Sequence, residues 1–169
     1  MRRTTALLLA VALALGGCSR GGDPAAAGEP GLAEVVRVVD GDTIIVEIAG
    51  AQERVRLIGI DTPESVDPRS PVDCFGPEAS AAAKALLPEG TSVRLVRDIE
   101  ARDRFDRLLA YVYRVDDGTF VNLALAERGF AEVATFPPNV AHTGDFVAAV
   151  ADAREQGLGL WGSCGPPSG

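Results

Sequence analysis

Hydrophobic and polar residues alternate along three consecutive segments after residue 31, which is the pattern of strands with one buried face. Two further apolar runs with the same character follow in the second half of the chain. We expect five strands, at 34–39, 43–48, 54–60, 92–98 and 108–115. Turn residues Asp40-Gly41-Asp42 separate the first two strands, and Gly50-Ala51-Gln52 separate the next two. The folded part therefore begins with an antiparallel meander.

Helical patterns follow the third and the fifth predicted strand. An alanine-rich segment at 78–87 lies between two prolines, one at its start and one after its end. Two more helices are expected at 122–128 and 146–156, with Asn122 and Asp145 as their N-caps. The predicted fold class is α+β, mainly β, namely a five-stranded antiparallel Greek-key barrel of the OB type with about three helices.

The N-terminal segment differs in composition from the rest of the chain. Two arginines and an apolar run at 6–15 match a secretory signal, and the run is shorter than the roughly 20 residues of a membrane-spanning helix. Small residues precede Cys18, as in a bacterial lipoprotein signal, so 1–17 should be removed and Cys18 lipidated. Residues 18–31, rich in Gly, Ala and Pro, should form a flexible tether. The sequence thus predicts an exported lipoprotein, anchored in a membrane and facing the periplasm or the extracellular side of a bacterium, with plain secretion as the alternative.

The remaining chain has the size and the apolar content of one domain. The protein has 169 residues, 47% of them hydrophobic, and we place the domain at 32–164 with a short tail at 165–169. Two cysteines, Cys74 and Cys164, remain after Cys18, and an even pair in an exported domain favours a disulfide. Two unrelated thiols are the alternative. A monomer is the simplest expectation for the oligomeric state.

Charge and composition narrow the chemistry. The single histidine, His142, disfavours a histidine-rich zinc site and a Ser-His-Asp triad, so any catalysis should depend on carboxylates, arginines and a metal ion. The formal net charge of −8 argues against a broadly basic surface for nucleic acid. A polyanionic partner would therefore need a local cluster of arginines.

Two short acidic segments carry the strongest chemical signal. Asp40-Gly41-Asp42-Thr43 precedes the second predicted strand, and Asp61 ends the third. Because adjacent antiparallel strands can bring such ends together, Asp42 and Asp61 should face one point. Hard oxygen ligands suit Ca²⁺ or another hard divalent ion rather than zinc. The alternative is that these aspartates only form a turn.

Two more residues favour a site over a simple turn. Arg56 occupies a strand position among apolar residues, where an unpaired guanidinium is costly, so it should meet a carboxylate or an anion. Glu64 follows Pro63 in a loop, from which a base could reach a water molecule beside a metal. A purely structural ion pair and a solvated loop glutamate are the alternatives.

The spacing of these residues resembles the staphylococcal nuclease, or thermonuclease, family. That family has Asp-Gly-Asp-Thr, a hydrophobic stretch, an arginine nine or ten residues later, and then Asp-x-Pro-Glu, and every position matches here. A second similar segment runs over 103–113, and the similarity continues over 121–129. The resemblance covers roughly 33–162.

The resemblance implies a nuclease that hydrolyses phosphodiester bonds of DNA, with RNA as a further candidate substrate. It assigns Ca²⁺ as the cofactor, although the residues alone leave Mg²⁺ and Mn²⁺ open. The implied roles are as follows: Asp42 and Asp61 as metal carboxylates, Thr62 as a carbonyl ligand, Arg56, Glu64 and Arg107 as catalytic residues, Arg104 and Phe136 as substrate contacts, and Asp40 and Asp103 as supports for the others. Glu64 would be the general base, and the two catalytic arginines would clamp the scissile phosphate.

The second segment departs from the family pattern at two positions. Phe105 and Asp106 stand where tyrosine and glycine are expected, so a phosphate-binding hydroxyl is missing and Asp106 should add a negative charge beside Arg107. Substrate affinity is the property most affected. The competing interpretation of the whole chain is a non-catalytic OB-type lipoprotein that binds nucleic acid or a partner protein.

Overall fold

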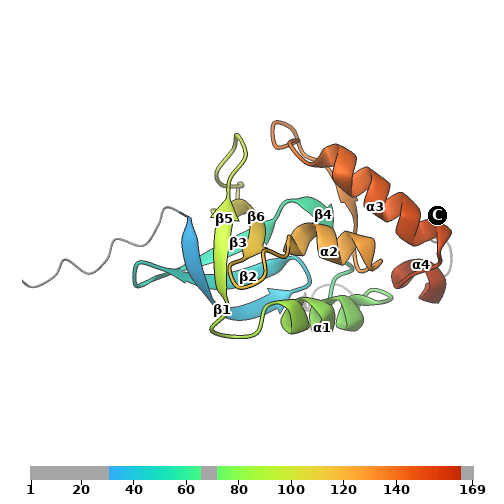
Figure 1. Cartoon of the computed structure of the whole chain (residues 1–169), viewed down its shortest axis with the longest axis horizontal. Coiled ribbons are helices and arrows are strands. Elements are labelled where there is room, and N and C mark those ends of the chain that lie inside the picture. The colour runs from blue at the N-terminus through green and yellow to red at the C-terminus, as the bar shows by residue number, and fades with distance from the viewer. Residues whose placement is uncertain (1–30, 66–71, 165–169) are drawn as a thin grey trace, which may run out of the picture.

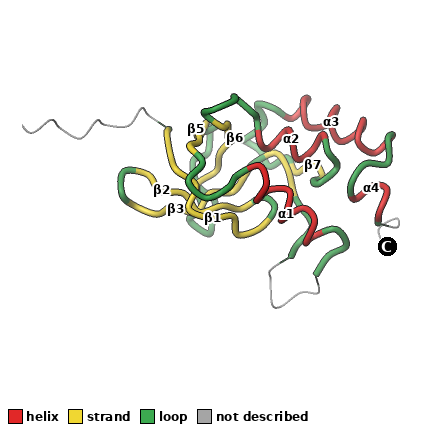
Figure 2. The backbone as a smooth tube through the Cα atoms, turned by 60° about the horizontal axis from the view of Figure 1, so that its bottom comes forward, coloured by secondary structure: helices red, strands yellow, loops and turns green. Residues whose placement is uncertain are grey.

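The computed structural model describes residues 31–65 and 72–164. The predicted signal peptide, the tether, the lipidation at Cys18 and the C-terminal tail lie outside these residues and stay predictions. The elements in chain order are β1 (Leu32–Asp40), β2 (Thr43–Ile48), β3 (Ala51–Leu57), β4 (Gly59–Asp61), α1 (Gly76–Leu86), β5 (Ser92–Val96), β6 (Leu108–Arg114), α2 (Val121–Glu127), β7 (Glu132–Ala134), α3 (Thr143–Glu155) and α4 (Leu160–Ser163). The helices lie mainly to one side of the strands (Figures 1 and 2).

Five strands close a barrel in the order β1-β2-β3-β6-β5, and β5 pairs back to β1. The predicted class of fold is therefore confirmed, but one detail of its topology is wrong. Strand β6 pairs with β3 in parallel, whereas the other neighbours in the barrel are antiparallel. The chain between these strands forms a long crossover through α1 and β5, which is the kind of connection that a parallel pair requires. Alternation along each strand predicts a strand but says nothing of its partner's direction.

The third predicted strand divides into β3 and β4. Strand β4 leaves the barrel and pairs with β7 in a two-stranded sheet. Gly59 opens β4 with a φ of +86°, and a Cβ at this position would lie 2.1 Å from the Phe146 ring on α3. Glycine is needed here because the chain must turn with positive φ while it packs against an aromatic ring. This turn separates Arg56 from Asp61 and directs both toward one side of the barrel.

The helices begin one to three residues earlier than predicted, and their caps differ. Phe120 and His142 occupy the N-cap positions of α2 and α3, while Asp145 lies in the first turn of α3. Asn122 is fully buried instead, where it accepts a hydrogen bond from the Val112 amide and donates one to the Ile58 carbonyl. Its side chain satisfies backbone groups at the junction of β4, β6 and α2. No helix in the described residues is both long and apolar enough to span a membrane.

The core fills the barrel and continues under the helices. Fully buried side chains include Ile44, Val55 and Leu57 from the barrel and Leu125 and Phe146 from α2 and α3. These positions alternate along the strands as the sequence pattern predicts. The outward-facing residues at the β1–β2 turn and along β3 are thereby held on a rigid support.

Cys74 and Cys164 form the predicted disulfide, with 6.0 Å between their Cα atoms and a sequence separation of 90 residues. We expect the double variant Cys74→Ser/Cys164→Ser to lose about 2–4 kcal/mol of the free energy of unfolding, because a closed loop restricts the unfolded chain. Urea unfolding of the oxidised protein and of the variant measures this difference. Reductant should lower the midpoint of the parent protein only, and equal midpoints without reductant would contradict the prediction.

Candidate active site

A cleft of about 810 Å³ opens between the β1–β2 turn, strands β3 and β4, and the loops around residues 100–107 and 134–139. It is lined by all ten residues that the sequence singled out for catalysis, metal binding, substrate contact or support: Asp40, Asp42, Arg56, Asp61, Thr62, Glu64, Asp103, Arg104, Arg107 and Phe136. These residues come from segments far apart in the chain. The fold therefore brings the whole predicted set to one place.

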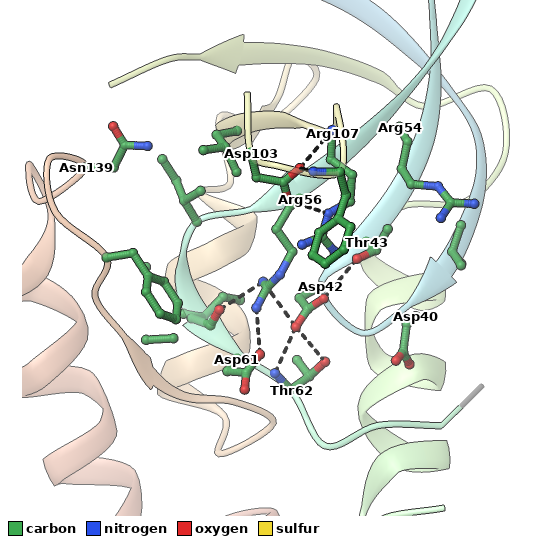
Figure 3. A pocket seen from close by; sticks show the side chains of 18 of the residues that line it. Asp40, Asp42, Thr43, Arg54, Arg56, Asp61, Thr62, Asp103, Arg107 and Asn139 are labelled. Atoms are coloured by element: carbon green, nitrogen blue, oxygen red, sulfur yellow. Dashed lines mark hydrogen bonds and ion pairs between the residues drawn. The ribbon is translucent and has the colours of Figure 1, made fainter. Parts of the chain in front are cut away.

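Arg56 lies at the centre of this group, with its guanidinium between two carboxylates (Figure 3). Its Nη1 lies 3.1 Å from Asp42 Oδ2, and its Nη2 donates a hydrogen bond of 2.6 Å to Asp61 Oδ1. Nη1 also donates to the backbone carbonyls of Leu57 and Ile60. The Arg56 side chain is only 12% exposed, so these partners supply what a buried charge requires. The expectation that Arg56 meets a carboxylate is confirmed.

Asp42 is held in place by the segment that carries Thr62. Its Oδ2 accepts hydrogen bonds from the Thr62 amide at 3.0 Å and from Thr62 Oγ1 at 3.2 Å, and its Oδ1 accepts one from Thr43 Oγ1. A Cβ on Gly41 would lie 2.6 Å from Thr62 Oγ1. The glycine of the Asp-Gly-Asp turn thus allows close packing against Thr62. Asp61 directly precedes Thr62, so the hydrogen bonds between Asp42 and Thr62 bring Asp61 close to Asp42. Both carboxylates then contact Arg56.

The carboxylates of the cleft influence one another electrostatically. Partial desolvation raises the pKa of Asp61, Arg56 lowers it, and Asp42 and Glu132 raise it further. The Asp61 side chain is nevertheless 66% exposed and accessible from the cleft. Burial also raises the pKa of Asp40, and the neighbouring Glu64 carboxyl raises it as well. A hydrogen bond from Ser65 to the Asp40 carboxylate acts in the opposite direction. The cleft therefore gathers more negative charge than Arg56 alone neutralises.

Arg107 lies in a short turn that Asp103 organises. Asp103 Oδ1 accepts hydrogen bonds from the amides of Phe105 and Arg107, and Asp103 Oδ2 accepts one of 2.6 Å from Arg107 Nε. Burial alone would raise the pKa of Asp103, but these hydrogen bonds bring it below its usual range. Since Arg107 pairs through Nε, its terminal nitrogens are directed elsewhere. Asp103 orients Arg107 without occupying the whole guanidinium.

Asp106 directly precedes Arg107 in the chain, and the structure shows a second arginine, Arg102, as the partner of its carboxylate. Its carboxylate lies 3.6 Å from Arg102 Nη1, which also donates a hydrogen bond to the Asp106 carbonyl. Arg102 is held in turn by both carboxylate oxygens of Glu53 on β3. Asp106 has a φ of +64°, a conformation that favours glycine and that aspartate tolerates. Arg102 lies one residue before the second motif segment, which begins at Asp103, and only the folded chain shows its partners.

Two phenylalanines stand at the edge of the cleft. Phe136 is 74% exposed and Phe105 is 65% exposed, and the guanidinium carbons of Arg104 and Arg107 lie 4.7 Å and 5.6 Å from the centre of the Phe105 ring. Such exposed rings provide flat apolar surfaces beside cationic groups. Phe105 lacks the hydroxyl of the family's tyrosine, and its contacts with the two arginines were not predicted from the sequence.

Other cleft residues were not predicted at all. Arg54 on β3 lines the cleft two residues before Arg56. The two-residue period of a strand could have found it, because it places both arginines on one face. Glu100 and Asn139 also line the cleft and are joined by reciprocal hydrogen bonds between the Asn139 amide and the Glu100 backbone. No sequence signal predicts that pair.

Comparison with known proteins agrees with this arrangement. The family model described as staphylococcal nuclease homologue matches residues 54–163. The chain is 42% identical over 127 residues to the thermonuclease of Staphylococcus intermedius, an alignment covering 75% of this chain and 74% of that protein. It is 39% identical to the thermonuclease of Staphylococcus hyicus, covering 76% of this chain and 74% of the relative. It is also 38% identical to the SPbeta prophage-derived endonuclease YokF of Bacillus subtilis (strain 168), covering 76% of this chain and 43% of that protein. The chain therefore belongs to the staphylococcal nuclease family, and the predicted enzyme class, a nuclease, is confirmed.

Proposed function

We propose that this protein is a metal-dependent endonuclease that hydrolyses phosphodiester bonds of DNA, with RNA as a further substrate and Ca²⁺ as the preferred ion. One observation carries the proposal: Arg56 pairs with both Asp42 and Asp61 in a cleft that Glu64 and Arg107 also line. The same cleft is lined by two arginines, which we assign to the phosphate, two aspartates, which we assign to the metal ion, and Glu64, which we assign as the base. A binding module without catalysis would not need that combination.

The two arginines suit the charge that develops during phosphodiester hydrolysis. A planar guanidinium donates two parallel hydrogen bonds to phosphate oxygens and keeps its charge at any ordinary pH. Arg56 and Arg107 enter the cleft from β3 and from the turn before β6, so a phosphate between them would contact both. Stabilisation by such fixed donors is the largest contribution to many enzymatic rate enhancements.

The donor atoms that we propose for a metal ion in the cleft are all oxygens. Within residues 31–65 and 72–164, no group of three or more His, Cys, Asp or Glu side chains is arranged to hold a metal ion. We assign two carboxylates, Asp42 and Asp61, as the ligands, and the Thr62 carbonyl and water would supply further oxygens. Oxygen ligands of this kind are preferred by Ca²⁺, Mg²⁺ and Mn²⁺ rather than by zinc. When bound, the ion would supply positive charge that stabilises the attacked phosphate.

Arg56 and a divalent ion would share the same carboxylates. In the described structure Arg56 neutralises Asp42 and Asp61, which would otherwise repel each other. If Asp42 and Asp61 held a divalent ion, the ion would supply the positive charge that Arg56 provides in this structure, and the Arg56 donors would be available for a phosphate. Metal binding and phosphate binding are coupled in this proposal through one side chain.

Glu64 is the proposed general base. It lines the cleft, and its backbone is fixed by Asp73, whose Oδ2 accepts a hydrogen bond from the Glu64 amide and whose own amide donates to the Glu64 carbonyl. Asp73 precedes the disulfide cysteine Cys74, so the covalent link anchors the segment that holds Glu64. A base on a fixed segment can take a proton from a water that attacks phosphorus.

The decisive test is metal-dependent cleavage. We expect the full chain to cleave single-stranded and duplex DNA in millimolar Ca²⁺ and to lose this activity in excess chelator, with recovery when Ca²⁺ is restored. Asp42→Asn should require a higher Ca²⁺ concentration for half-maximal rate, because it removes one anionic ligand. Gel electrophoresis of labelled oligonucleotides measures the rates.

The matched control is Asp152→Asn, which makes the same change on the exposed surface of α3 outside the cleft. It should keep the Ca²⁺ dependence of the parent protein. Binding of DNA without any cleavage in Ca²⁺, Mg²⁺ or Mn²⁺ would reject the proposal in favour of a non-catalytic module.

A further inference from the structure

The outer face of strands β1, β2 and β3 carries its side chains in rows that the strand register defines. Thr43 on β2 pairs with Asp40 on β1 and with Arg56 on β3, and this row borders the cleft. In the next row Ile45 pairs with Arg37 on β1 and with Arg54 on β3. Directly paired residues of antiparallel strands point to the same face of a sheet. Arg37 and Arg54 therefore flank Ile45. Their row lies next to the row of Asp40, Thr43 and Arg56, which we call the catalytic row.

Both arginines are exposed and have no partner within the part of the chain that the structure describes. Across residues 31–65 and 72–164, neither side chain takes part in a hydrogen bond, an ion pair or an aromatic contact. Arg56, Arg102 and Arg107, by contrast, each pair with a carboxylate. In a chain with a formal net charge of −8, two adjacent unpaired cations beside an acidic cleft are unusual.

The row lies within reach of the catalytic arginine and continues away from it. Residues two apart on a strand are separated by about 6.6 Å, which is the expected distance between the Cα atoms of Arg54 and Arg56. Arg37 and Arg54 are separated by two strand spacings, or about 10 Å. Arg54 also lines the cleft, and its guanidinium points away from Asp42 and Asp61 (Figure 3).

The next row on the same face limits the basic surface. There Glu47 on β2 pairs with Glu34 on β1 and with Gln52 on β3. A polyanion that leaves the cleft across this face would meet Arg54 and Arg37 first and would be repelled beyond them. The face thus has a basic strip of limited width, bordered by the catalytic row on one side and by two glutamates on the other.

We propose that Arg54 and Arg37 form a phosphate track that binds the backbone of a nucleic acid strand next to the scissile phosphate. The inference rests on the proposed nuclease function and adds a binding site for it. Guanidinium groups on a rigid sheet suit phosphate oxygens of any base sequence, so the track should contribute affinity without sequence preference. It also explains how an acidic protein holds a polyanion.

The test measures binding of a fluorescent single-stranded DNA decamer in chelator, where cleavage does not interfere, over a range of salt concentrations. We expect Arg54→Gln and Arg37→Gln each to raise the Kd. Each should also make the slope of log Kd against log salt shallower by about 0.7, and the double variant should make it shallower by about 1.4. Arg54→Lys should keep most of the parent slope, because the lysine ammonium still brings one positive charge to a phosphate. A purely structural role for Arg54 would not follow this pattern.

Arg128→Gln is the matched control, since it removes an exposed arginine on the far end of α2. It should keep the parent slope and Kd. The ratio of parent to double-variant kcat/KM in Ca²⁺ should grow with strand length from a dinucleotide to a decamer, because only longer strands reach the track.

The outcomes separate the track from the proposed function. If the parent protein cleaves DNA while the double variant keeps the parent Kd and slope, the track is wrong and the nuclease proposal stands. If the parent binds with a slope that the double variant loses but never cleaves, the track stands and the catalytic proposal falls. Absence of any binding by the parent protein overturns the track.

Discussion

We expect Glu64→Gln to lower kcat for DNA cleavage by about 10²–10⁴-fold, with a much smaller change in KM. Glutamine has nearly the same size as glutamate and can still donate and accept hydrogen bonds, but it cannot take a proton from water. The backbone at position 64 is fixed by Asp73, so the substitution should leave the loop in place. Single-turnover cleavage of a labelled oligonucleotide in saturating Ca²⁺ measures the chemical step directly.

The control for this prediction is Glu89→Gln, which makes the same change in an exposed turn away from the cleft. Its kcat should equal that of the parent protein. The pH dependence offers a second check, because the low-pH limb of the rate profile should disappear in Glu64→Gln if this carboxylate is the base. A Glu64→Gln variant that keeps the parental kcat would assign the base to another group.

Replacing Arg107 with alanine should lower kcat by about 10²–10³-fold, the cost of removing one fixed donor to a developing charge. Binding should weaken less than turnover, because the guanidinium is expected to contact the phosphate most strongly when its charge is largest. Arg107→Lys should recover only part of the rate, since a single ammonium lacks the planar fork. Rates at saturating DNA and Kd values in chelator separate the two effects.

Asp103→Asn tests whether Arg107 must be oriented as well as present. Its side chain receives three hydrogen bonds that define the turn, including that from Arg107 Nε. The variant should show a smaller loss of kcat than Arg107→Ala, and combining the two changes should cost little more than Arg107→Ala alone. Arg128→Ala is the control for loss of charge. Independent, additive losses would show that Asp103 acts through something other than Arg107.

The local pattern predicted where most elements lie but not how they associate. Alternation located the five barrel strands because one face of each is buried, and this holds whatever the neighbouring strand is. The parallel pairing of β3 with β6, the departure of β4 from the barrel and the short strand β7 depend on contacts between distant segments. Asn122 is a further example. Its residue type suggests a helix N-cap, but in the fold it is buried and forms hydrogen bonds with the backbone of Val112 and Ile58.

The candidate catalytic and metal-binding residues of the cleft could be identified from the sequence, because their chemistry depends on residue type and their spacing along the chain matches a motif. Asp42, Arg56, Asp61, Glu64 and Arg107 could all be singled out in this way. The interaction partners of charged residues depend on the folded arrangement. The pairing of Asp106 with Arg102, and the row that joins Arg37 to Arg54 through Ile45, arise from register and side-chain direction. Such relations are set by the packing of the whole barrel, so a linear pattern does not contain them.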